Sequence, residues 1–248
     1  MKREEREKST DVGVATPIAV FAYNFPHKKT QDVIIRLHLE GYYVALILAA
    51  DPVPLDIPAS SIRAKIEHQG LIHPERIAER LGIEYVVANH NSREALSAVN
   101  RKQTPLGVIA GARILKGEIV HCFPNGIINL HPGLIPEARG LDAMLWSIYR
   151  DVPLGVTAHL IDEAVDAGRV LVRRPLPMRR DDTLLDLSER LYEVQLDLLP
   201  EAVDLALEER AARLENKGDY NGKMPSELEQ QVVAHLPAYL QRHAEEPR

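Results

Sequence analysis

An asparagine and a histidine, Asn129 and His131, stand two residues apart at the end of the short apolar run 126–130. In a β-strand, residues two apart point to the same face, so the amide and the imidazole are expected side by side. Pro132 favours extended backbone at His131 and holds that geometry to the end of the strand. An amide can stabilise developing negative charge, and an imidazole can move protons near neutral pH. Position alone leaves a structural polar pair as an equally good interpretation.

Three acidic residues, Asp162, Glu163 and Asp166, follow an alternating run at 155–161 and precede Gly168. Taken alone, a solvated acidic turn is a better interpretation than a metal site, because the spacing is not that of a calcium loop. Sequence signatures of phosphate loops, dinucleotide-binding loops, zinc hydrolases and serine hydrolases are missing from the sequence. We therefore expect no metal ion and no dinucleotide.

The elements that must position these residues alternate between strand and helix. β-Branched runs predict strands over 17–23, 42–50, 83–88, 106–110, 126–130, 155–161 and 169–173. Apolar periodicity predicts helices over 30–40, 74–81, 92–100, 140–149, 184–214 and 225–243, with Thr30 as an N-cap and Pro200 marking a break. This alternation predicts an α/β fold, a Rossmann-like and mostly parallel sheet with helices on both faces and a short helical C-terminal extension.

Composition narrows the possible partners and compartments. Among 248 residues, 30 are Lys or Arg and 36 are Asp or Glu, so the net charge of −6 disfavours a nucleic-acid partner. The longest apolar run, 42–50, is far shorter than the roughly 20 residues of a membrane span. The single cysteine, Cys122, suits a reducing compartment. We expect a cytoplasmic protein with no membrane partner.

Several separated segments, taken in order, resemble the signature of folate-dependent formyltransferases. They are Asn129–Pro136, Arg139-Gly140, Gly155–His159 and Asp166–Gly168. Upstream, Ala110–Leu115 resembles the segment with which that family contacts folate. The likeness extends over 17–203 and is most specific over 107–170. The family includes glycinamide ribonucleotide formyltransferase, methionyl-tRNA formyltransferase and the sugar N-formyltransferases.

The resemblance implies a site and a co-substrate, N10-formyltetrahydrofolate, with no metal. Asn129, His131 and Asp166 take the catalytic positions. The positions implied for folate binding are Gly111, Ala112, Arg113, Leu115, Ile161, Asp162 and Glu163. It also implies a disordered tail at 1–13, a formyltransferase catalytic domain at 14–214 and a helical C-terminal extension at 215–248.

The sequence departs from each well-known branch of that family. The loop 23–29 lacks the Gly/Ser-rich composition with which the glycinamide ribonucleotide enzyme holds its substrate phosphate. The helical residues after 214 do not suit the β-domain of the tRNA enzyme, and 1–16 do not suit the regulatory domain of formyltetrahydrofolate hydrolase. The motif 131–140 is most similar to sugar N-formyltransferases. We therefore expect a small-molecule amine acceptor, a nucleotide-linked amino sugar.

Several alternatives stay open at this point. The chain could be a glycinamide ribonucleotide-type formyltransferase, a formyltetrahydrofolate hydrolase, or a catalytically silent homologue that binds folate. The helix at 225–243 could build a homodimer or cap its own domain. The segment 220–225 could reach the active site or form only a turn.

Overall fold

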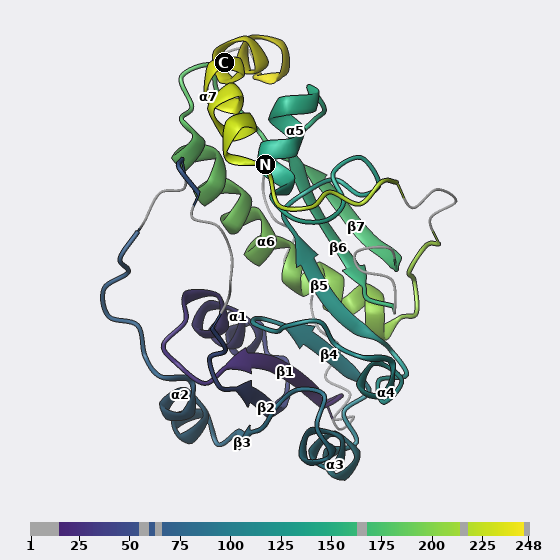
Figure 1. The fold of residues 1–248 in the computed structure, drawn as a ribbon. Helices are drawn as coiled ribbons and strands as arrows, with labels where there is room; N and C mark the ends of the chain where they lie inside the picture. The colour runs from purple at the N-terminus through teal and green to yellow at the C-terminus, as the bar shows by residue number, and fades with distance from the viewer. Residues whose placement is uncertain (1–14, 55–59, 63–65, 163–167, 214–217, 246–248) are drawn as a thin grey trace.

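The computed structural model describes residues 15–54, 60–62, 66–162, 168–213 and 218–245. The strands of these residues form one sheet in the order β3-β2-β1-β4-β5-β6-β7 (Figure 1). The parallel strands are β1 (Ile18–Tyr23), β2 (Val44–Ala50), β3 (Glu84–Val87), β4 (Leu106–Ile109) and β5 (Ile127–His131). The antiparallel strands are β6 (Gly155–Leu160) and β7 (Arg169–Pro175). The predicted Rossmann-like, mostly parallel sheet is confirmed.

Helices cover both faces of the parallel half of the sheet (Figure 1). On one face lie α1 (Lys28–Leu39), α2 (Pro74–Leu81) and the second half of α6 (Leu184–Leu207). On the other lie α3 (Arg93–Lys102) and the single turn α4 (Gly117–Val120), which the sequence did not predict. The inner strands β1, β2, β4 and β5 are buried on both sides, which explains why they appear in the sequence as continuous apolar runs.

A second apolar cluster surrounds the antiparallel edge of the sheet. It joins β6 and the first half of α6 to α5 (Ala143–Arg150) and α7 (Ser226–His243), which lie side by side in Figure 1. Tyr239 of α7 is fully buried, and its hydroxyl donates a 2.8 Å hydrogen bond to the carbonyl of Val152. The predicted C-terminal helix is therefore present and packs against its own chain.

Three local predictions were wrong. The N-cap of α1 is His27 rather than Thr30, because the His27 imidazole accepts a hydrogen bond from the Thr30 backbone N–H at 3.3 Å. The predicted break at Pro200 does not occur, and α6 ends at Leu207 rather than at the predicted residue 214, because Ala212 pairs with Val170 of β7. Proline costs a helix interior about 3 kcal/mol. Burial of Leu198, Leu199, Ala202 and Val203 on both sides of Pro200 offsets that cost.

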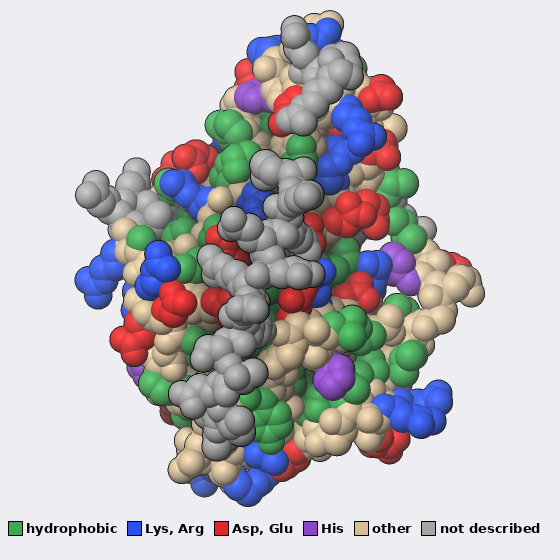
Figure 2. Space-filling view, turned by 180° about the vertical axis from the view of Figure 1, so that it is seen from behind, with side chains coloured by type: hydrophobic (Ala, Val, Ile, Leu, Met, Phe, Trp, Pro, Cys, Tyr) green, Lys and Arg blue, Asp and Glu red, His purple; other side chains and the backbone are tan. Residues whose placement is uncertain are grey.

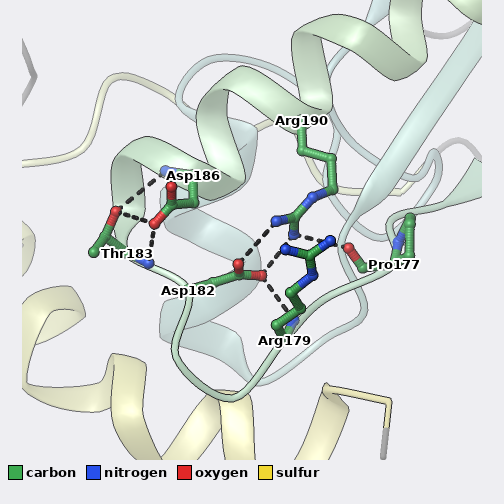
Figure 3. Close-up of polar contacts among 6 residues, drawn as sticks. All are labelled: Pro177, Arg179, Asp182, Thr183, Asp186 and Arg190. Carbon is green, nitrogen blue, oxygen red and sulfur yellow. Dashed lines mark hydrogen bonds and ion pairs between the residues drawn. The ribbon is translucent and has the colours of Figure 1, made fainter. Parts of the chain in front are cut away.

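The N-terminus of α6 is held by a network of polar contacts (Figure 3). Thr183 and Asp186 form a reciprocal capping box at the first turn. The buried Asp182 carboxylate accepts a bidentate pair of hydrogen bonds from Arg190, at 2.6 and 2.8 Å. Hydrogen bonding from Arg190 holds the pKa of Asp182 below its usual range. These contacts fix where α6 begins and hence where its next side chains lie.

The surface carries charges of both signs. Acidic and basic side chains are interspersed over the described part of the face shown in Figure 2. None of the helices within the described ranges is both long enough and apolar enough to cross a membrane.

Candidate functional site

Asn129 and His131 lie at the carboxyl end of β5 and line one cavity of about 720 Å³. The β5 strand sits between parallel β4 and antiparallel β6, where the sheet changes strand direction. The side chain of Leu130, between them, lies on the opposite face of the strand by alternation, and it is buried. The structure thus brings together the amide and imidazole that the sequence placed on one face.

The Asn129 side chain is oriented by a histidine on the neighbouring strand. Asn129 Nδ2 lies 3.2 Å from Nε2 of His159, its partner in the β5–β6 register. His159 is fully buried, and its ring meets that of His131 edge-on at a centroid distance of 6.4 Å. Because an amide nitrogen only donates, His159 Nε2 is the acceptor and fixes the rotation of the amide.

The His131 ring is held by the loop that follows it. His131 Nε2 lies 2.7 Å from the carbonyl oxygen of Ala138, and the side chain is buried. A carbonyl can only accept, so Nε2 carries a hydrogen. In the neutral ring the lone pair is therefore on Nδ1, and Nδ1 is the atom that gains a proton.

Thr157 of β6 forms hydrogen bonds to the loop that follows His131. Its hydroxyl donates to the Gly133 carbonyl at 2.8 Å and accepts from the Ile135 backbone N–H at 3.0 Å. The Leu134 carbonyl in turn accepts from the Ala138 N–H at 2.7 Å. A Cβ atom at Gly133 would lie 2.8 Å from His131 Nε2, so the close approach of loop and ring requires glycine there.

The other walls of the cavity come from distant parts of the chain. The described lining residues outside β5 are Lys29, Ser60, Ile62, Ile66, His68, Pro132, Gly140–Leu145, Leu184, Leu185, Ser188, Glu189, Leu191, Tyr192, Gln195 and Lys223. Lys223 belongs to a segment that is joined to the start of α5. There Asn221 pairs with Gly140, and Trp146 Nε1 donates to the Gly222 carbonyl at 2.8 Å. The segment 220–225 therefore reaches the cavity rather than forming only a turn.

Lys29 and Gln195 are cavity residues that the sequence patterns did not identify as a pair. They come from α1 and α6, and Lys29 Nζ lies 2.9 Å from Gln195 Oε1. Lys29 Nζ also lies 3.4 Å from the carbonyl of Leu130, between the two site residues of β5. Burial lowers the pKa of Lys29 to about 8. The sequence signal was weak, since the two residues are separated by 166 positions.

The predicted folate-binding segment follows β4. A Cβ atom at Gly111 would lie 2.7 Å from the Tyr23 ring, and Tyr23 donates to the Ala112 carbonyl at 3.2 Å. Arg113 is exposed and lines a different hollow, of about 360 Å³, with Tyr23, Phe25 and the chain after β2. Leu115 is buried in the apolar layer beneath α3 and α4.

The remaining predicted positions follow β6. Ile161 is half-buried and packs against the same apolar layer to which Leu115 belongs. Asp162 is exposed. Glu163 and Asp166 lie outside the described residues. Within the described ranges, no three His, Cys, Asp or Glu side chains gather as metal ligands.

The chain was compared with known proteins. Residues 55–203 match the Formyl transferase family model. The chain is 33% identical over 138 residues to the human trifunctional purine biosynthetic protein adenosine-3, covering 52% of this chain and 14% of that protein. It is 30% identical over 151 residues to methionyl-tRNA formyltransferase of Anaeromyxobacter dehalogenans, covering 60% and 44%. The chain thus spans less than half the length of either relative.

Solved structures share the fold. A sugar N-formyltransferase from a Shewanella species superposes with a TM-score of 0.61 at 20% identity, covering 89% of this chain and 87% of that one. Glycinamide ribonucleotide transformylase 1 from Symbiobacterium toebii gives 0.59 at 24% identity, covering 82% and 92%. With a family model matched over 55–203 and the Asn129–His131 pair in the cavity wall, the chain belongs to the formyl transferase family.

Proposed function

We propose that this protein transfers a formyl group from N10-formyltetrahydrofolate to the primary amine of a small acceptor, an amino sugar linked to a nucleotide. One observation carries the proposal. Asn129 and His131 line a single cavity of about 720 Å³ in a chain of the formyl transferase family. That volume lies within the range of about 300–1,000 Å³ usual for small-molecule sites.

The described residues suit a folate co-substrate. The reaction needs a hydrogen-bond donor for the formyl oxygen and a group that accepts a proton, and Asn129 and His131 are of those types. Bound N10-formyltetrahydrofolate would supply a formyl group on a nitrogen that can leave.

In this proposal each site residue has a separate role in the reaction. Attack by the acceptor amine forms a carbon–nitrogen bond and places negative charge on the formyl oxygen. Asn129, oriented by His159, donates a hydrogen bond to that oxygen. His131, with Nε2 committed to Ala138, takes the proton of the amine at Nδ1 and returns it to the departing nitrogen. Asp166, as the resemblance implies, orients or charges the imidazole.

The choice of acceptor rests on the loop after β1 and on the motif 131–140, which is most similar to sugar N-formyltransferases. The loop 23–29 holds the stacked rings of Tyr23 and Phe25 at 5.1 Å, where a Gly/Ser-rich phosphate loop would leave backbone N–H groups exposed. Both support an amino sugar over glycinamide ribonucleotide.

The test offers N10-formyltetrahydrofolate with a panel of amines. The panel holds several nucleotide-linked amino sugars, glycinamide ribonucleotide and an amino-acid control. Release of tetrahydrofolate is followed by absorbance, and one added formyl group is sought by mass spectrometry. We expect formylation of an amino sugar and none of the amino acid.

The other outcomes separate the alternatives. Formylation of glycinamide ribonucleotide alone would replace the amino sugar by that acceptor. Consumption of the co-substrate with no formylated amine would indicate hydrolysis. Folate binding with no turnover on any amine would indicate a silent homologue and would contradict the proposal.

A further inference from the structure

Lys29 has a setting that its neighbour Lys28 does not share. Lys28 Nζ pairs with Asp32 at 2.8 Å and lies 3.7 Å from the centroid of the Tyr192 ring. Lys29 Nζ is held by two neutral oxygens, of Gln195 and Leu130, and lines the cavity. Among the described residues, no carboxylate lies within 4 Å of Lys29 Nζ. Lys29 therefore places a positive charge in the cavity with no negative partner among those residues.

The partner oxygens are fixed by their own contacts. Gln195 is buried, and its Nε2 donates to the Leu191 carbonyl one turn earlier at 3.3 Å, so its Oε1 faces Lys29. The Leu130 carbonyl belongs to the ordered end of β5. Both oxygens accept, so they favour the charged ammonium over the neutral amine. An ammonium has three N–H donors, of which these oxygens take two.

The acidic side chains of the same cavity are placed elsewhere. Asp142 Oδ2 accepts a 2.9 Å hydrogen bond from the Met224 backbone N–H. Glu189, nearly two helical turns before Gln195 on α6, lines the cavity but does not reach Lys29. A buried ammonium loses solvation that neutral oxygens restore only in part, and an oxyanion would restore the rest. The burial that brings the pKa of Lys29 to about 8 reflects that loss.

We infer that Lys29, oriented by Gln195, binds an oxyanion of the acceptor, either a phosphate or a sugar carboxylate, and so selects acceptors that carry one. The inference rests on the proposed function, because the oxyanion is part of the molecule whose amine is formylated. The ammonium lies beside the carbonyl of Leu130, between Asn129 and His131. The oxyanion would then lie in the same cavity as the reacting amine, on the side of α1 and α6.

The first arm of the test needs no formyl transfer. The lysines of the full chain are labelled at pH 8 with limiting acetic anhydride, and each is read by peptide mass spectrometry. The probes are UDP, which carries phosphates, glucuronate, which carries a carboxylate, and glucose as the uncharged control. We expect UDP or glucuronate to slow labelling of Lys29 by about fivefold or more, since an ion-paired ammonium is held protonated. Labelling of Lys28 should not change.

The probes also identify the source of the oxyanion. Protection by UDP alone assigns a phosphate, and protection by glucuronate alone assigns a sugar carboxylate. Equal labelling of Lys29 with UDP, glucuronate and glucose would overturn the inference, whether or not the protein transfers formyl groups.

The second arm compares Lys29→Met with the matched variant Lys28→Met on the acceptor that the panel identifies. We expect Lys29→Met to raise the acceptor KM by roughly 30-fold or more, because truncating one partner of a buried charge pair is costly. The kcat should change less than about threefold, and Lys29→Arg should restore part of the affinity. A fall in kcat with KM unchanged would assign Lys29 to proton transfer and overturn the inference. If no amine is formylated, the proposed function fails, and the labelling arm still decides the role of Lys29.

Discussion

Glu229 of α7 accepts hydrogen bonds from both donors of Ser61, the backbone N–H and the hydroxyl. Glu229 Oε2 accepts from the Ser61 backbone N–H at 2.8 Å and from its hydroxyl at 2.9 Å. Burial alone would raise the pKa of Glu229, but hydrogen bonds from Ser61 and Ser60 outweigh it and hold that pKa below its usual range. Ser60 and Ile62 line the cavity, so the C-terminal helix sets part of the cavity rim.

Replacing Glu229 by alanine should therefore affect both stability and acceptor binding. We expect a loss of about 1–3 kcal/mol in the free energy of unfolding, since the N–H and hydroxyl of Ser61 lose their acceptor. We also expect the acceptor KM to rise by about tenfold, because Ser60 and Ile62 at the cavity rim would no longer be held in place through Ser61. A tenfold change corresponds to about 1.4 kcal/mol of binding free energy. Urea denaturation and steady-state kinetics measure the two effects. Glu227→Ala, at an exposed position of the same helix, is the control. Equal stability of the two variants would contradict the assigned contact.

Asn129→Ala and His131→Ala should remove most of the turnover while leaving the fold intact. Loss of one donor to a developing oxyanion lowers kcat by about 10²–10³-fold, and loss of a general base has a similar effect. His38→Ala, at an exposed position of α1, should retain full activity. Tetrahydrofolate release measures the rate, and circular dichroism checks the fold. Rates like those of the unaltered protein in both variants would contradict the catalytic assignment.

His159 should act on catalysis through Asn129. His159→Phe removes the acceptor that lies 3.2 Å from Asn129 Nδ2 and frees the amide to rotate. We expect kcat/KM to fall by about tenfold, which corresponds to about 1.4 kcal/mol. If the effect passes through the amide, His159→Phe should cost little more in a chain that already carries Asn129→Ala. Additive losses in that double-mutant cycle would show that His159 works by another route.

Thr157 should set the position of the His131 ring. Thr157→Val keeps the shape of the side chain and leaves the Ile135 N–H and the Gly133 carbonyl without their partner. We expect a destabilisation of about 1–3 kcal/mol together with a lower kcat. Thr157→Ser retains the hydroxyl and should recover most of both quantities. An unchanged kcat in Thr157→Val would show that Thr157 does not set the position of the loop and the His131 ring.

The pairing of Asp182 with Arg190 should make stability depend on pH. The pKa of Asp182 is lower in the folded protein, so the pair stabilises the fold at pH above the unfolded value of about 3.9. That contribution is lost as pH falls through the folded value. At neutral pH, Asp182→Asn should cost about 1–3 kcal/mol, and the cost should shrink below about pH 4. Thermal unfolding from pH 7 to pH 3 measures this, with the exposed Asp181→Asn as control. A cost that does not vary with pH would exclude the charged pair as its cause.

The sequence predicted those parts of the fold that depend on local patterns. Continuous apolar runs indicate strands buried on both faces, and the Asn129–His131 spacing follows from period-two geometry; the structure agrees on both. Helix α2 begins and ends as predicted, because Pro74 and Gly82 act at its two ends. Local rules failed where tertiary packing determines the structure. At Pro200, the packing of α6 against both core clusters keeps it one continuous helix.

The cavity was less predictable than the catalytic pair. Its walls join α1, α6, Lys223 and the residues Ser60, Ile62, Ile66 and His68, and no local pattern brings such distant segments together. The pairing of Lys29 with Gln195 and that of Ser61 with Glu229 each connect more than 160 positions. Only the packed structure shows such contacts, since neither residue of either pair has a distinctive sequence neighbourhood.

Helix α6 runs uninterrupted for 24 residues, a length of about 36 Å at 1.5 Å per residue. Its first half contributes Leu187 and Leu191 to the cluster of α5 and α7, and its second half contributes Leu199 and Val203 to the cluster of α1. The helix is thus packed into a different apolar cluster at each of its ends. A tilt at either end must move the other, so the width of the cavity between α1 and α6 is mechanically tied to the packing of the C-terminal helix.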